Sequence, residues 1–111
     1  MKNYLAVFLG SPGKMQSTPM STEDMQKGMM AWGKWVEDHK GDIEQQGSPL
    51  GKTKKISKAG IEDIRNEMGA WVVVQAGSEE EAAKMFEGHP HFTIFPGDRV
   101  EVMECLPMPT M

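Results

Sequence analysis

The chain has 111 residues, of which 39% are hydrophobic and 25% charged, and its formal net charge is −4. This length predicts one domain, residues 1–111, with one modest core, and the acidic balance argues against nucleic acid or anionic lipid as a partner. Cys105 is the only cysteine, which excludes an intramolecular disulfide and a zinc site built from thiolates. The sequence has neither a signal-peptide pattern nor an apolar run near the roughly 20 residues that span a bilayer. We therefore expect a cytoplasmic protein.

Tyr4–Leu9 is apolar on both faces, which is the pattern of a central strand covered on both sides. The polar stretch that follows, up to Pro19, is expected to be a loop. Ser21 is placed to cap a helix. One apolar stripe at helical spacing marks the inner side of that helix: Met25, Met29, Trp32 and Val36. Gly41 is expected to close it.

The middle of the chain is more polar. Asp42–Gln46 and Lys52–Ile56 predict strands nearer a sheet edge, joined by a turn at Gly47–Gly51. Residues 57–67 show no clear period and are expected to form a loop. Gly69–Gln75 is the second segment that is apolar on both faces, and it therefore predicts a second central strand.

A second helix begins with a capping box, because Ser78 and Glu81 have the S-x-x-E spacing. Its apolar side consists of Ala82, Met85 and Phe86. Gly88 is expected to end this helix, with Pro90 preventing its continuation. Arg99–Leu106 then predicts the last strand.

The predicted order is strand, helix, strand, strand, helix, strand. This order indicates an α+β fold of the ferredoxin-like βαββαβ type, an antiparallel sheet with the first and third strands at its centre. Two helices would cover one face of the sheet. The other face also carries apolar side chains, so we expect a homodimer in which two such faces pack together.

With these elements in place, the chain resembles the YCII-related family (YciI-like and DGPF-like proteins). The resemblance covers most of the chain and rests on the opening M-x-x-Y-L-A strand, the turn Gly47-Ser-Pro-Leu, the strand Gly69-Ala-Trp-Val-Val-Val followed by Ser78-Glu-Glu-Glu-Ala-Ala, and the proline after the second helix. It implies a dimeric α+β barrel. The D-G-P-F motif of one branch is absent, and Ser57–Met68 occupies its place.

The resemblance directs attention to the segment Gly88–Phe92. Some family members are thought to use a His–Asp pair in a cleft between helices and sheet, and one relative eliminates chloride from a chlorinated hydroxyquinol. The family's aspartate lies in a D-P-[FY] element after the second helix, where this chain has His89, Pro90 and His91. An imidazole replaces the carboxylate, and the histidine expected near the first strand is absent. His89 and His91 are therefore the candidate catalytic residues, but the family's pair is not carried over intact.

The residues themselves leave three roles open for these histidines. His89 can bond the free carbonyls of a helix end. Either ring can transfer a proton if an acidic side chain orients it; the candidate partners are Asp38, Asp42, Asp98 and Glu101. A metal would need His39 or a carboxylate as well, and two histidines flanking a proline in an extended segment point to opposite sides. We predict no metal and no cofactor.

The candidate ligand-contacting residues are Trp35, Trp71, Phe92 and Ser48. Trp71 and Trp32 are also expected to fill the core, whereas Trp35 lies off the centre of its helix and is placed to line a cleft. We expect a protein that binds or transforms a small organic molecule by histidine-assisted proton transfer. The alternative is a non-enzymatic dimeric binding module with structural histidines. A third hypothesis is a monooxygenase or haem-handling relative, with His39 as its candidate histidine.

Overall fold

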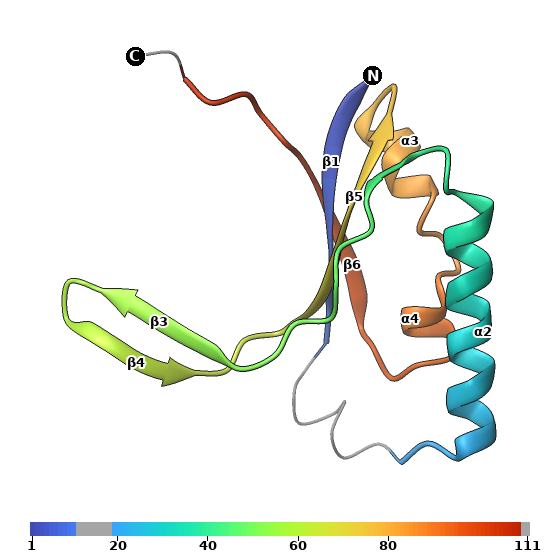
Figure 1. Cartoon of the computed structure of the whole chain (residues 1–111), viewed down its shortest axis with the longest axis horizontal. Coiled ribbons are helices and arrows are strands. Elements are labelled where there is room, and N and C mark those ends of the chain that lie inside the picture. Colours follow the sequence, from blue (N-terminus) through green and yellow to red (C-terminus); the bar gives the residue numbers. More distant parts are fainter. Residues whose placement is uncertain (11–18, 110–111) are drawn as a thin grey trace.

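The computed structural model describes residues 1–10 and 19–109, so most of the loop predicted after the first strand lies outside the described residues. Four strands form an antiparallel sheet in the order β2 (Ile43–Gln45), β5 (Met68–Ala76), β1 (Lys2–Leu9) and β6 (Arg99–Glu104). Three helices within the described residues cover one face of this sheet: α2 (Thr22–Asp38), α3 (Glu79–Lys84) and α4 (Pro90–Thr93) (Figure 1). The result is a small α+β fold whose sheet is compatible with the ferredoxin-like arrangement.

The two segments predicted as central strands are neighbours at the middle of the sheet. The pairs Tyr4↔Val74, Ala6↔Val72 and Phe8↔Ala70 follow one another along β1 and β5. These side chains alternate with those of the other face, because successive residues of a strand point to opposite sides. They belong to or pack against the hydrophobic core between the sheet and the helices. Burial of this apolar face is the main stabilising contribution to the fold.

Helix α2 begins as predicted, because the Ser21 hydroxyl accepts a hydrogen bond of 3.0 Å from the backbone N–H of Asp24. Its end differs from the prediction. The last helical residue is Asp38, and His39 caps the helix by donating its backbone N–H to Trp35 O at 3.1 Å. Gly41 is therefore not the closing residue, and none of the positive-φ glycines in the described chain lies there.

The capping box predicted for α3 is present. Ser78 Oγ accepts from the backbone N–H of Glu81 at 3.2 Å, and the Glu81 carboxylate accepts from the N–H of Gly77 at 3.0 Å. Gly88 then adopts a φ of +69°, which a glycine allows without steric cost. Pro90 does more than stop the chain from continuing as helix, because it is at the start of α4, where its fixed φ and missing N–H are suited to the first turn.

The region expected to be an edge strand and a loop is instead a separate β-hairpin. β3 (Thr53–Ser57) pairs with β4 (Gly60–Ile64) and not with the four-stranded sheet. Two cross-strand ion pairs link the hairpin: Lys54–Asp63 at 2.6 Å and Lys55–Glu62 at 3.2 Å. Charge pairs rather than alternating apolar residues mark these strands, so apolar periodicity does not reveal β4.

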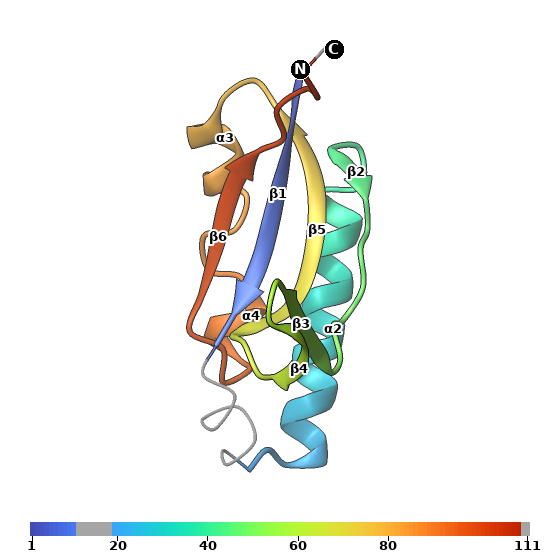
Figure 2. The same ribbon diagram turned by 90° about the vertical axis from the view of Figure 1, so that its left-hand side faces the viewer.

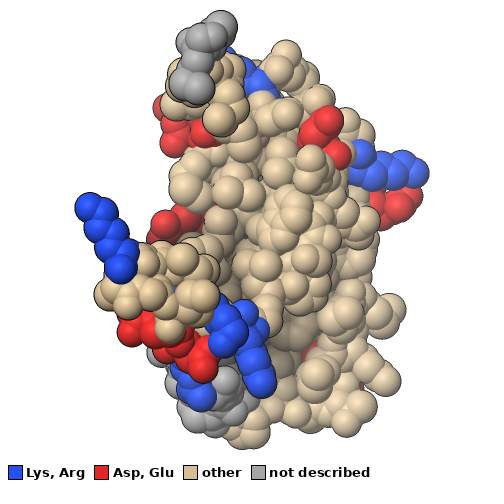
Figure 3. Space-filling view, turned by 60° about the vertical axis from the view of Figure 1, so that its left-hand side comes forward, with Lys and Arg blue, Asp and Glu red and all other residues tan. Residues whose placement is uncertain are grey.

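The sheet face opposite the helices, which we call the helix-free face, is apolar along β1 and at its centre, and it carries the ion pair Arg99–Glu101 at one end of β6. Figure 2 looks onto this face, with β6, β1 and β5 side by side and the β3–β4 hairpin projecting toward the viewer. Leu5 at its centre lies opposite Val73 on one side and Met103 on the other. The space-filling view shows a broad area without charged residues beside the hairpin (Figure 3). Within residues 1–10 and 19–109, no helix is long and apolar enough to cross a membrane.

Candidate functional site

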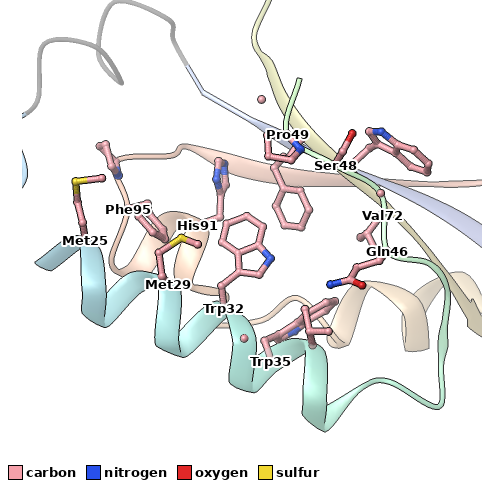
Figure 4. Close-up of a pocket in the computed structure, with 18 of the residues that line it drawn as sticks. Met25, Met29, Trp32, Trp35, Gln46, Ser48, Pro49, Val72, His91 and Phe95 are labelled. Carbon is pink, nitrogen blue, oxygen red and sulfur yellow. The ribbon is translucent and has the colours of Figure 1, made fainter. Parts of the chain in front are cut away.

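A cavity of about 770 Å³ lies between α2 and the sheet. Figure 4 shows Met25, Met29, Trp32 and Trp35 on the helix side, with Gln46, Ser48 and Pro49 across from them. His91 and Phe95 lie at the same site, at and after α4 (Figure 4). This volume is within the range of small-molecule sites in proteins.

The wall opposite α2 is formed by the chain after β2, which runs along the start of β5. Leu50 N donates to Gly69 O at 2.9 Å, Trp71 N donates to Ser48 O at 3.3 Å, and Pro49 bridges Ala70. Gly47 has a φ of +70°, and a β-carbon there would overlap the backbone carbonyl of Trp71. Only glycine fits this close approach, so the turn Gly47-Ser-Pro-Leu brings Ser48 to the cavity.

His91 is the titratable residue that lines the cavity. Its side chain is 3% exposed, and Nε2 bonds Leu9 O at 2.8 Å. Because a carbonyl only accepts, this bond places the proton of the neutral ring on Nε2 and leaves a lone pair on Nδ1. Nδ1 has no hydrogen-bond partner among the described residues. It is also not among the described polar side-chain atoms that are both fully buried and without a hydrogen bond. The free nitrogen of His91 therefore remains accessible.

His89 occupies a different environment, although only Pro90 separates it from His91. The side chain is fully buried, and its ring centroid lies 4.8 Å from that of Phe8, 4.5 Å from Trp32 and 4.9 Å from Trp35. Nδ1 accepts a hydrogen bond of 3.0 Å from the backbone N–H of His91. His89 thus caps α4, and it does not line the cavity.

The neutral form of His89 follows from this burial. Loss of hydration on burial, together with the nearby His91 and His39, lowers the pKa of His89 to about 4. Since Nδ1 is an acceptor, the proton is on Nε2, and that atom has no hydrogen-bond partner. The aromatic rings around it provide only weak N–H···π contacts. The two histidines therefore differ in kind: His89 is held neutral in the core, and His91 faces the cavity.

The predicted ligand-contacting residues are divided between two places. Trp35, Trp71 and Ser48 line the cavity. Trp35 is also a core residue, and its indole N–H donates to Met85 O at 2.7 Å. Phe92 is 39% exposed and lies apart from the cavity, beside a shallow depression formed with α3 and β6. Sequence reasoning did not single out Gln46 or Phe95, which carry no local signal for a site.

Two of the proposed acidic partners form ion pairs with basic side chains, and a third lies near His91. Asp38 pairs with Lys34 at 3.4 Å and Glu101 with Arg99 at 2.7 Å, both on the surface. Asp98 donates its backbone N–H to Leu9 O at 3.0 Å, so this carbonyl accepts from both Asp98 and His91. A backbone carbonyl thus takes the place that a carboxylate has in a His–Asp pair.

Neither a charged side chain nor a metal-binding cluster is found at the cavity in the part of the chain that the structure describes. The described lining residues include no Asp, Glu, Lys or Arg. No group of three or more His, Cys, Asp or Glu residues in residues 1–10 and 19–109 is placed to hold a metal ion. His39 bonds Trp35 O through Nδ1 at 2.8 Å and lies against the Trp35 ring, outside the cavity lining.

Comparison with known proteins supports the fold. No family model and no curated protein matches the sequence. Among solved structures, the chain is similar to 5-chloro-2-hydroxyhydroquinone dehydrochlorinase (TftG) of Burkholderia phenoliruptrix AC1100 in complex with 2,5-dihydroxybenzoquinone, with a TM-score of 0.56 and 19% identity over 90% of this chain and 89% of that one. It also matches the Arabidopsis thaliana protein At3g17210, with a TM-score of 0.41 and 16% identity over 100% and 99% of the two chains. The first likeness supports a shared fold.

Proposed function

We propose that the chain binds a small planar organic molecule in the cavity between α2 and the sheet, and that His91 transfers a proton to or from it. The observation that carries this proposal is the anchoring of His91: Nε2 is bonded to Leu9 O, and Nδ1 is accessible beside a cavity of about 770 Å³. An imidazole with one nitrogen fixed and the other free is suited to act as a general base.

The cavity lining supports a flat, largely apolar ligand. Trp32 and Phe95 offer aromatic surfaces, Met25 and Met29 offer adaptable thioethers, and Gln46 adds a polar amide. No charged side chain among the described lining residues would balance a charge on the ligand. A neutral aromatic or quinone-like molecule therefore suits the site better than a carboxylate or a phosphate.

The proton-transfer step uses groups that are in place. His91 Nδ1 accepts a proton from an acidic O–H or C–H of the ligand, and the resulting imidazolium keeps its Nε2–H bonded to Leu9 O. The proton returns to the ligand or passes to water when the ligand leaves. His89 remains neutral throughout, because its pKa is lowered to about 4, and so it adds no positive charge beside the imidazolium.

The proposal includes the assembly that the sequence pattern favours. The chain is a single YCII-related domain, residues 1–111, that pairs as a homodimer through the helix-free face. Apolar residues at the centre of this face, Leu5, Val73 and Met103, support that contact. The similar dehydrochlorinase structure contains 2,5-dihydroxybenzoquinone, and this compound is a reasonable first probe.

A thermal-shift screen of hydroxylated quinones and phenols, including 2,5-dihydroxybenzoquinone, tests binding. The variant His91→Gln removes the base and keeps an amide donor for Leu9 O, and His39→Gln is the matched control outside the cavity. For a ligand that binds, NMR follows exchange of its acidic carbon-bound protons into D₂O. We expect faster exchange with wild type and with His39→Gln, and the buffer rate with His91→Gln.

Other outcomes separate the alternatives. A ligand that binds wild type and His91→Gln equally, without faster exchange in either, would indicate the non-enzymatic binding module. The cavity proposal as a whole would be contradicted if no compound in the screen stabilises the protein and none changes the protein's NMR chemical shifts.

A further inference from the structure

The β3–β4 hairpin is a regular element that the rest of its own chain does not support. Its five pairs run in register from Thr53↔Ile64 to Ser57↔Gly60. The two strands contact each other, and neither packs substantially on another element of the described chain. Figures 1 and 2 show the hairpin standing away from the sheet on the side of the helix-free face. An isolated two-stranded hairpin is only marginally stable in water, so this one needs a surface to pack on.

The end of the hairpin is apolar. Ile56 and Ile61 lie directly opposite each other, 72% and 70% exposed. Two β-branched residues paired across strands form one apolar unit. The charges next to this apolar pair are matched within the hairpin, Lys54 with Asp63 and Lys55 with Glu62, and Lys58 in the turn leaves the hairpin with a net charge of +1. This is the character of a contact surface rather than of a solvated loop.

The helix-free face offers a surface of matching character. Its central row, Val73, Leu5 and Met103, crosses three neighbouring strands and is apolar throughout. Figure 3 shows no charged residues over the broad area beside the hairpin. Because the hairpin projects away from the sheet, Ile56 does not pack on the helix-free face of its own chain. A second copy of the chain presents both the same face and the same hairpin.

The area required by a stable dimer also points to the hairpin. The 8, 9 and 6 residues of β1, β5 and β6 give the helix-free face a footprint of about 380 Å² from strand spacing and rise. A stable interface buries about 800 Å² on each partner. The sheet face alone supplies about half of this. The 5 residues in each of β3 and β4 add about 160 Å² on each partner, which raises the footprint to about 540 Å² and so narrows the shortfall.

We propose that the hairpin is a dimerisation arm: Ile56 and Ile61 of one copy pack on the helix-free face of a second copy, and the two arms are exchanged about a two-fold axis. In such an isologous interface each copy gives an arm and receives one. This inference deepens the homodimer proposed above and is independent of the ligand site. It also explains a regular hairpin without support from its own chain.

The test compares the double variant Ile56→Thr/Ile61→Thr with wild type by sedimentation equilibrium over about a thousandfold range of concentration. Threonine keeps the β-branched shape and the cross-strand pair, and removes apolar area. Met30→Gln is the matched control, since Met30 is 77% exposed on the opposite side, in α2. We expect a dimer for wild type and control, and a dissociation constant at least about a hundredfold higher for the double variant.

Hydrogen exchange on wild type gives a second measurement that needs no substitution. Amides of β3 and β4 should exchange at least about tenfold more slowly above the dimer dissociation constant than below it. Two results together would refute the dimerisation arm and leave the sheet dimer intact. The dimer dissociation constant of the double variant would lie within about threefold of the wild-type value, and the hairpin amides would exchange equally at both concentrations. A wild-type chain that stays monomeric throughout would overturn both, whereas the ligand assays on His91 would be unaffected.

Discussion

Acid should destabilise the protein through one residue, His89. The folded state holds this imidazole neutral, with its pKa lowered from 6.5 to about 4, whereas the unfolded chain protonates it below pH 6.5. The unfolded state therefore binds more protons between these two values, and stability falls as the pH falls. The contribution is complete above pH 6.5, is lost progressively down to about pH 4, and changes no further below that.

The size of the effect follows from the same two values. Lowering a pKa from 6.5 to about 4 corresponds to a loss of about 3 kcal/mol over the whole window, of which about 2 kcal/mol is lost by pH 5. A domain of this kind has a free energy of unfolding of about 5–15 kcal/mol in total. His89 alone thus makes a substantial part of the stability dependent on pH.

Urea unfolding of wild type, His89→Phe and His39→Gln at pH 7.5 and pH 5 measures this contribution. Phenylalanine fills the site among Phe8, Trp32 and Trp35 without titrating, although it loses the bond to the His91 N–H. Carboxylates titrate in all three proteins, so the informative quantity is the difference between them. We expect wild type and His39→Gln to lose about 2 kcal/mol more than His89→Phe. Equal losses in wild type and His89→Phe would refute the reasoning.

Four glycine-to-alanine substitutions test the packing around the cavity. Alanine at Gly33, where nothing lies within 4 Å, should raise the free energy of unfolding by about 0.5–1 kcal/mol. Alanine at Gly28 would overlap the Phe95 ring, so urea unfolding should show no stabilisation. Because Phe95 lines the cavity, displacement of its ring into the cavity should also weaken ligand binding. Gly97→Ala overlaps the His91 imidazole and should cost about 1–3 kcal/mol and reduce ligand binding, whereas Gly51→Ala, with open space, should do neither.

The sequence predicted the parts of the fold that depend on local patterns. Ser21 and Ser78 both cap helices, because a short polar side chain before an apolar stripe satisfies the first backbone N–H groups. The two segments apolar on both faces became the central pair, β1 and β5. The strand predicted at Lys52–Ile56 matches β3, but β4 and its pairing with β3 were missed, because the cross-strand charge pairs can be seen only when the register is known.

The sequence pointed to the segment around Pro90 as a candidate site, which stays a prediction, and it did not separate the two histidines. The sequence indicated His89 and His91 equally, and their difference depends on the helix that begins at Pro90. In an extended segment the two rings would point to opposite sides. Here His89 is the N-cap and His91 lies in the first turn, so one ring enters the core and the other reaches Leu9 O. The pair Gly88–His89 before Pro90 is itself a helix-start signal, since proline favours the first helical position.

This arrangement couples the two histidines through the backbone rather than through their rings. His89 Nδ1 accepts from the N–H of His91, so the neutral, buried His89 fixes the point from which the His91 side chain leaves the helix. Protonation of His89 would remove this acceptor and place a charge in the aromatic core next to His91. The low pKa of His89 therefore protects the geometry of His91 at any pH well above 4. Burial among the rings of Phe8, Trp32 and Trp35 keeps His89 neutral, and this neutral neighbour holds the proposed base His91 in one orientation.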